Sequence, residues 1–154
     1  MLLAERVDAI TQRLRRRLDH SLGAVAERVR ILPRLPHPRY LSLLEQSDVV
    51  LDTPHYNGVT TTHDAFYLGK PVVTLEGDFQ RSRYVAACYR VMERPELVTK
   101  TPDEYASLAV ALGCEPDRRR ELARHLTHTC EVLWDPATKI RDHEERFLEM
   151  VAAR

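Results

Sequence analysis

The stretch from Asp48 to Leu75 constrains the fold more than any other part of the chain, because two apolar runs flank a polar loop and a helical segment. The first run, DVVLD, predicts a strand of the kind that parallel sheets bury on both faces. Residues Thr60 to Leu68 predict a helix, Gly69 its end, and the run PVVTL the next strand. Together they form a βαβ unit, so we expect an α/β fold with a Rossmann-like parallel sheet and flanking helices.

The segments on both sides of this unit continue the pattern. Apolar spacing predicts a helix over 5–18, a strand over 29–32 and a short helix over 40–46. Downstream it predicts a helix over 82–92, a short edge strand over 96–98, and helices over 102–112, 116–127 and 136–152. Thr101, Pro102 and Glu104 predict a capping box at the start of the first of these closing helices. We therefore expect a single domain over 1–154 with a helical C-terminus.

Charge and cysteine content argue against several classes of function. The chain has 23 Lys and Arg against 23 Asp and Glu, so no overall field favours nucleic acid or an anionic membrane. The three cysteines have no CxxC spacing, which predicts neither a disulfide framework nor a zinc site. No apolar run approaches the roughly 20 residues that span a bilayer, and no cleavable leader is evident. We expect a cytoplasmic protein with no nucleic-acid or membrane partner.

The loop and helix start inside the βαβ unit carry the residues that suggest chemistry. In open α/β sheets, ligands bind outside the carboxyl ends of the strands, and the first turn of the following helix offers unpaired amides that favour anions. Gly58 lets the backbone approach a ligand closely, and Thr60, Thr61 and Thr62 add hydroxyl donors. Asp64 lies about one helical turn further on, where a carboxylate suits sugar hydroxyls. The set predicts a site for a nucleoside diphosphate and its ribose.

The same residues also have a purely structural explanation. Threonine is common at helix N-caps, and an acidic side chain in the first turn complements the helix dipole. Under this hypothesis Thr60, Thr61 and Asp64 stabilise the helix and bind nothing.

The segment LDTPHYNGVTTTHDAFYLGKPVVTLEG resembles the SPINDLY-type O-linked N-acetylglucosamine transferases, whose pattern is LDT, a short loop, NG, TT, D and then GxPVVT. The similarity continues upstream through ILPRLPHPRYLSLLEQSDVVLD and downstream through SRY, DEYASLAVAL and LWDPATKIRDHEERFLEM, so it covers most of the chain. That family has the two-lobed GT-B fold and holds its UDP-sugar mainly with the C-terminal lobe. The resemblance implies that this chain corresponds to that lobe, with the N-terminal lobe absent.

The resemblance also implies which residues contact the donor substrate. By position they are Leu35, His37, Tyr40, Asn57, Gly58, Thr60, Thr61 and Asp64. The threonines and their amides would hold the diphosphate, the aspartate the ribose, and the first three residues the uracil. For His37 and Tyr40, a surface histidine and a helix-packing tyrosine are the alternatives. The implied partners are UDP or a UDP-sugar and a protein acceptor.

Two departures from the family bear on function. Val59 stands where some members carry a histidine near the phosphates, and Tyr40 replaces a histidine of the family, so these positions bear on donor affinity or sugar choice. The family's acceptor site and a lysine that assists the leaving diphosphate lie upstream of this region. We expect a donor-binding domain that transfers a sugar, N-acetylglucosamine, to a protein Ser or Thr hydroxyl when joined to its other lobe. A noncatalytic nucleotide-sugar-binding module and a structural remnant are the alternatives.

Other polar side chains are weaker candidates. His55 and His63 flank the threonines as potential acids or bases, and Arg83 is placed to approach a phosphate. Each has an ordinary surface position as its alternative. His125 and His128 match no recognised zinc spacing, so no metal and no cofactor besides the donor substrate is expected.

Overall fold

The computed structural model describes residues 2–3 and 8–153, and the chain divides into two compact units, Met1–Leu43 and Leu44–Arg154. Helix α2 (His37–Glu45) carries the chain from one unit into the other. Within the described residues, no helix has both the length and the apolar character that a bilayer span requires.

The first unit contains a parallel pair of short strands joined by a helix. Strand β1 (Leu2–Leu3) pairs with β2 (Ile31–Leu32). Helix α1 (Asp8–Leu22) and the 3-10 helix η1 (Gly23–Arg28) connect them. The predicted helix and strand are thus confirmed, although residues 5–7 of the predicted helix lie outside the described residues.

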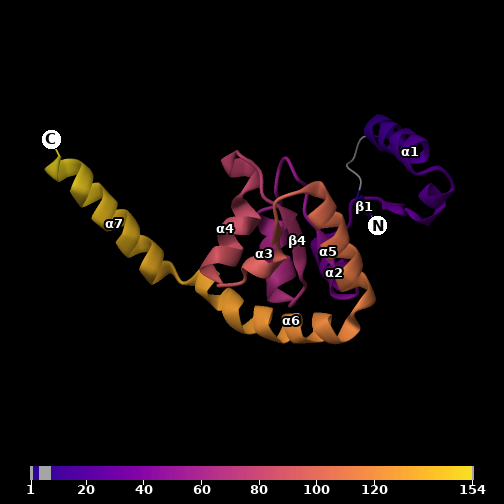
Figure 1. The fold of residues 1–154 in the computed structure, drawn as a ribbon. Helices are drawn as coiled ribbons and strands as arrows, with labels where there is room; N and C mark the ends of the chain where they lie inside the picture. Colours follow the sequence, from indigo (N-terminus) through magenta and orange to yellow (C-terminus); the bar gives the residue numbers. More distant parts are fainter. Residues whose placement is uncertain (1, 4–7, 154) are drawn as a thin grey trace. The chain divides into compact units, whose positions relative to one another are not determined.

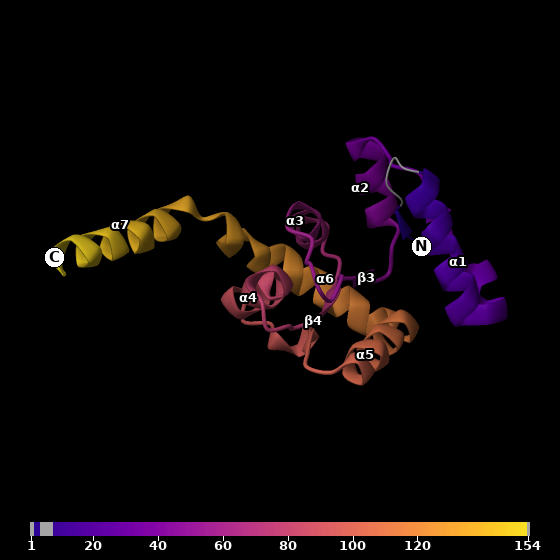
Figure 2. The same ribbon diagram turned by 90° about the horizontal axis from the view of Figure 1, so that it is seen from above.

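The second unit contains a parallel sheet of three strands in the order β3-β4-β5. The strands are β3 (Val50–Leu51), β4 (Val72–Leu75) and β5 (Val98–Thr99). Helix α3 (Thr60–Tyr67) joins the first two strands, and α4 (Tyr84–Val91) joins the last two. The central strand contacts α3, α4 and α5 (Pro102–Cys114), and it lies between α4 and α5 in Figure 2. The predicted βαβ unit is confirmed.

Buried aromatic side chains hold helices α3 and α4 against β4. Phe66 and Tyr89 are fully buried and meet edge to face, with ring centroids 5.0 Å apart. The Tyr89 hydroxyl donates to the carbonyl of Val72 and accepts from its amide, each at 2.9 Å. Burial also raises the pKa of Tyr89, so the hydroxyl remains a donor. These contacts fix α3, which carries the predicted site, on the sheet.

Strand β3 departs from the sequence prediction. It is shorter than residues 48–52, and it lies at the edge of the three-stranded sheet, with Leu51 56% exposed. The prediction that this run is buried on both faces is therefore wrong for Leu51. An apolar run does not by itself distinguish a central strand from an edge strand, because the difference depends on neighbours far along the chain.

Three helices close the chain, as predicted: α5, α6 (Pro116–Thr129) and α7 (Pro136–Ala152). The 3-10 helix η4 (Cys130–Trp134) separates the last two. The predicted capping box is present, because the Glu104 amide donates to Thr101 Oγ1 and the Glu104 carboxylate accepts from the Thr101 amide, both at 3.2 Å. Helix α6 packs against both α3 and α5 (Figure 1).

Candidate functional site

The candidate site lies at the carboxyl end of β3, in loop 52–59 and the first turn of α3. A hollow of about 200 Å³ opens there, and Asp52, Gly58, Thr61 and Thr62 are among the residues that line it. This is the position at which open parallel sheets bind ligands.

Asp52 organises the loop from directly after β3. Its side chain is buried, and Oδ2 accepts from Asn57 Nδ2 at 2.5 Å and from Thr74 Oγ1 at 2.7 Å. Oδ1 accepts from the Gly58 amide at 3.3 Å. Burial raises the pKa of the Asp52 carboxyl, and these hydrogen bonds oppose the shift. The carboxylate is thus held by neutral donors that converge from the loop and from β4.

Asn57 is the second fixed point of the loop, with a side chain only 1% exposed. Nδ2 also donates to the carbonyl of Thr53 at 3.2 Å, and Oδ1 accepts from the Val85 amide at 3.3 Å. The Asn57 amide donates to the carbonyl of Arg81 at 2.7 Å. The hydrogen-bonding groups of this side chain are therefore engaged within the fold, and they give the loop its shape before any ligand arrives.

Gly58 leaves space for the first turn of α3. A β-carbon at this position would overlap the hydroxyl oxygen of Thr61. The Gly58 carbonyl accepts a hydrogen bond from Thr62 Oγ1, and Thr62 is buried. The Thr62 hydroxyl therefore serves the fold and is not displayed to a ligand.

Thr60 and Thr61 differ from Thr62 because both are exposed. The N-cap of α3 is Val59, and no side chain caps it. Among the residues that the structure describes, none accepts a hydrogen bond from the hydroxyl or the amide of Thr60 or Thr61. Helix capping therefore does not explain these two threonines. Two amides and two hydroxyls at a helix N-terminus are suited to an anion.

Asp64 and His63 follow on the same helix. Asp64 is partly exposed, one turn beyond Thr60 and Thr61. His63 Nε2 lies 2.6 Å from the Tyr84 hydroxyl of α4, so this ring is engaged in contacts between elements. His55 is exposed in the loop. The structure thus brings Asp64 together with the threonines on one short helix.

Leu35, His37 and Tyr40 belong to the first unit. Leu35 is partly buried in the segment before α2. His37 and Tyr40 lie in the first turn of α2, with ring centroids 6.3 Å apart and planes tilted by 31°. The structure therefore brings His37 and Tyr40 together on one helical turn, and the five predicted site residues from Asn57 to Asp64 lie in the second unit.

Glu76, directly after β4, is a functional candidate that sequence reasoning missed. Its carboxylate accepts from Arg90 and Lys100, each at 2.5 Å, and from Arg83 at 3.3 Å. The hydrogen bonds from Arg90 and Lys100 lower the pKa of Glu76 from 4.5 to about 2. Arg83 is thus paired with Glu76 in this state. The sequence signal that could have identified Glu76 is its position as an acidic residue directly after the predicted strand PVVTL.

The cysteines and the metal-ligating side chains form no site of their own among the described residues. Cys88 is buried on α4, where it packs as a small apolar side chain. In residues 2–3 and 8–153, no disulfide is formed and no group of three or more His, Cys, Asp or Glu is arranged to hold a metal ion.

Known proteins resemble this chain in both sequence and structure. Residues 20–133 match glycosyl transferase family 41. The chain is 35% identical over 106 residues to a UDP-N-acetylglucosamine–peptide N-acetylglucosaminyltransferase of Caenorhabditis elegans, covering 68% of this chain and 9% of that protein. It is also 34% identical over 123 residues to SPINDLY of Hordeum vulgare, a probable UDP-N-acetylglucosamine–peptide N-acetylglucosaminyltransferase. That match covers 77% of this chain and 13% of the relative. A mutant of the Thermobaculum terrenum O-GlcNAc transferase superposes with a TM-score of 0.81 and 29% identity, covering 94% of this chain and 29% of that chain.

The chain therefore spans only 9% and 13% of the length of these two curated relatives. Its parallel sheet with flanking helices matches part of an O-GlcNAc transferase, which confirms the predicted GT-B fold class and the resemblance to SPINDLY-type transferases. The family match covers most of the sequence, including the whole of loop 52–59 and α3. The chain belongs to glycosyl transferase family 41.

Proposed function

We propose that this chain is the donor-binding half of a glycosyltransferase that moves a sugar from a UDP-sugar to a protein Ser or Thr hydroxyl when joined to its other lobe. The observation that carries the proposal is the pair of exposed threonines at the N-terminus of α3, whose amides and hydroxyls have no acceptor among the described residues. The names of the relatives supply the donor and acceptor classes, so N-acetylglucosamine is the sugar that we propose.

The residues of the second unit would divide the donor between them. Thr60 and Thr61 would bind the diphosphate through their amides and hydroxyls, since a helix N-terminus favours negative charge. Asp64 would accept hydrogen bonds from the ribose hydroxyls. Gly58 would permit close approach of the diphosphate, and Asn57 would act through the loop that it fixes, because its side chain is buried and engaged.

Leu35, His37 and Tyr40 would contact the uracil, on the strength of the family resemblance. In this proposal residues 1–154 work as one donor-binding domain in the cytoplasm. Stabilisation of the leaving diphosphate and positioning of the acceptor hydroxyl would require groups from the other lobe. The chain alone would therefore bind the donor without transferring the sugar.

Calorimetric titration of the 154-residue chain with UDP tests the proposal. We expect a dissociation constant in the range of roughly micromolar to millimolar. Thr61→Val removes one hydroxyl donor and Asp64→Ala removes the proposed ribose acceptor, so each should weaken binding about 10-fold or more. Matched controls are Thr11→Val and Asp78→Ala, at positions outside the loop and α3.

The outcomes separate three hypotheses. Binding that is lost in the two site variants and kept in the controls supports a donor site. If no heat of binding is detected at millimolar UDP, the remaining hypothesis is that the chain is a structural remnant, which keeps the fold but does not use the site. Transfer by the chain joined to its other lobe would then distinguish a transferase from a noncatalytic binding module.

A further inference from the structure

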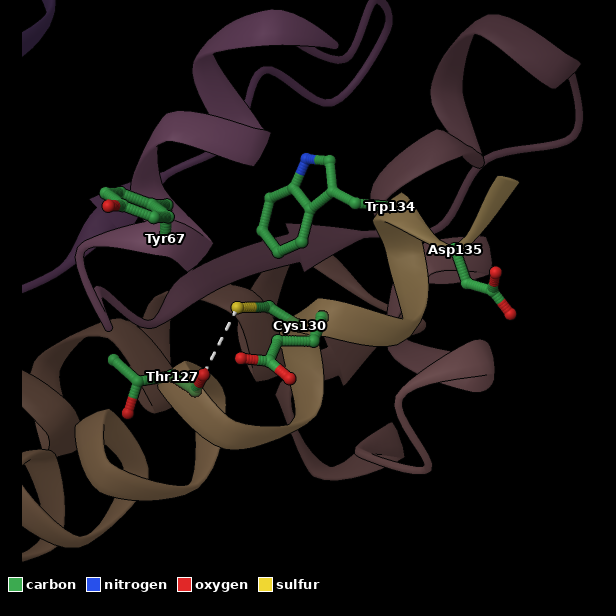
Figure 3. Close-up of a pocket in the computed structure, with 6 residues that line it drawn as sticks. Tyr67, Thr127, Cys130, Trp134 and Asp135 are labelled. Atoms are coloured by element: carbon green, nitrogen blue, oxygen red, sulfur yellow. Dashed lines mark hydrogen bonds between the residues drawn. The ribbon is translucent and has the colours of Figure 1, made fainter. Parts of the chain in front are cut away.

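A second cavity in the Leu44–Arg154 unit shares no lining residue with the candidate donor site. Its volume is about 740 Å³, and it lies where α3, α6 and η4 meet. The lining residues are Tyr67, Thr127, Cys130, Glu131, Trp134 and Asp135, and Figure 3 shows five of them labelled around the opening. Nothing in the proposed donor chemistry uses this cavity.

Two aromatic rings form the apolar wall of the cavity. Tyr67 is 72% exposed and Trp134 is 42% exposed, although both are large side chains that usually pack inside a protein. Their ring centroids are 6.5 Å apart and their planes are perpendicular. The His63 ring also lies near the indole of Trp134, with ring centroids 5.6 Å apart and planes tilted by 56°. The cavity thus presents two exposed π surfaces in a fixed relation.

The charge around these rings is negative. Glu131 lines the cavity, and its carboxylate forms no ion pair or hydrogen bond with a residue that the structure describes. Asp135 also lines it, with Oδ1 accepting from the Ala137 amide at 3.0 Å. None of the described lining residues is Lys or Arg. Tyr67 ends α3 and Thr127 lies in the last turn of α6, where the helix carbonyls add partial negative charge.

We propose that this cavity binds a lysine or arginine side chain presented by a protein partner. Aromatic faces attract a cation within about 6 Å of the ring centroid, and a carboxylate beside them adds an ion pair. An apolar side chain would use the rings alone, and a neutral sugar could add hydrogen bonds to the Glu131 carboxylate, but only a cation would add both a cation–π contact and an ion pair. The volume exceeds that of one basic side chain, which leaves room for neighbouring residues of an extended peptide. The proposal stands on the cavity alone and does not require UDP binding.

Trp134 is the single tryptophan of the chain, so its fluorescence reports directly on this cavity. Titration with acetyl-Gly-Arg-Gly-amide and its lysine equivalent should change the emission in a saturable way that weakens at high salt. The same peptide with citrulline removes the charge and retains the shape, and it should bind at least about 3-fold more weakly. Glu131→Gln should weaken the arginine peptide about 2- to 5-fold, and Tyr67→Ala about 3- to 10-fold.

Glu121→Gln is the matched control, because Glu121 is exposed on α6 and does not line the cavity. Urea unfolding of each variant shows that the fold is retained. The proposal is overturned by no fluorescence change at millimolar peptide, by equal affinity for the citrulline peptide, or by unchanged affinity in both cavity variants. Tighter saturation by N-acetylglucosamine than by the charged peptides would also overturn it, in favour of a sugar site.

Discussion

Asp52 and Glu76 occupy equivalent places, because each is the first residue after a strand in a parallel pair, yet they are stabilised in opposite ways. Asp52 accepts only from neutral donors, and burial raises its pKa. Glu76 accepts from three cationic side chains, and the hydrogen bonds from two of them, Arg90 and Lys100, lower its pKa to about 2. The carboxyl ends of β3 and β4 therefore differ in the charge of the side chains that surround each carboxylate.

The difference distinguishes the loop after β3, which neutral hydrogen bonds organise, from the ion cluster after β4. Asp52 uses its carboxylate to shape loop 52–59, which leaves Thr60 and Thr61 directed outward with available donors. Glu76 instead pairs with Arg83, Arg90 and Lys100, so these cations are engaged at the neighbouring strand end. In this account, anion binding depends on amides and hydroxyls more than on the nearby cations.

The largest expected effect is that of removing the Asp52 carboxylate. In Asp52→Ala, Asn57, Gly58 and Thr74 lose their common acceptor in a buried place, and a buried donor without an acceptor costs about 1–3 kcal/mol. We expect the free energy of unfolding to fall by about 2–4 kcal/mol, measured by urea denaturation. Asp78→Ala, at an exposed position outside this network, should change it by less than about 0.5 kcal/mol. A loss in Asp52→Ala no larger than in this control contradicts the assigned role.

The variant Glu76→Gln tests whether the ion pairs of Glu76 stabilise the fold. The folded pKa of about 2 lies below the ordinary value of 4.5, so the stabilisation is complete above pH 4.5 and is lost as pH falls from 4.5 towards 2. The cationic partners are at least half exposed, with side-chain exposures of 50–68%, so solvent screening reduces the effect to about 1–2 kcal/mol at pH 7.

The measurement is the free energy of unfolding of both proteins between pH 2 and pH 7. The difference between wild type and Glu76→Gln should shrink across the acidic half of that range. Glu121→Gln, an exposed glutamate without an ion pair among the described residues, should show no comparable trend. A pH-independent difference would mean that the ion cluster contributes no charge-dependent stability.

A smaller effect is expected from Gly58→Ala. The new β-carbon would overlap Thr61 Oγ1, and rotating one threonine side chain relieves the overlap at low cost to folding. We expect UDP affinity to fall about 3- to 10-fold while the free energy of unfolding changes by less than about 1 kcal/mol. Gly113→Ala, where a β-carbon meets no atom within 4 Å, should leave UDP affinity unchanged. Equal UDP affinity in the two variants would argue against Thr61 as a ligand contact.

Local patterns allowed the sequence to predict the βαβ unit and the capping box. Thr101 and Glu104 are three residues apart on one helix, so their contact follows from helix geometry. The spacing of Gly58, Thr60, Thr61 and Asp64 likewise depends on one loop and one helix, and the structure keeps these residues together on that loop and helix. These predictions needed no information about how distant elements meet.

Contacts between distant residues were not predictable from the same patterns. Asp52 meets Thr74 across 22 residues, and Glu76 meets Lys100 across 24 residues, through the pairing of parallel strands. Leu51 was expected to be buried because its run is apolar, but its exposure depends on strand order. The cavity between Tyr67 and Trp134 likewise requires α3 to meet η4. Sequence spacing alone does not define strand order or helix packing.

The central claim is that the first turn of α3 binds the diphosphate of a nucleotide donor. Titration of the isotopically labelled chain with UDP, followed in ¹H–¹⁵N correlation spectra, tests it at the atoms concerned. The account predicts that the amide signals of Thr60 and Thr61 shift progressively with UDP and at least about 10-fold less readily with uridine, which lacks the diphosphate. Unmoved Thr60 and Thr61 signals at saturating UDP, or equal shifts with uridine, would contradict it.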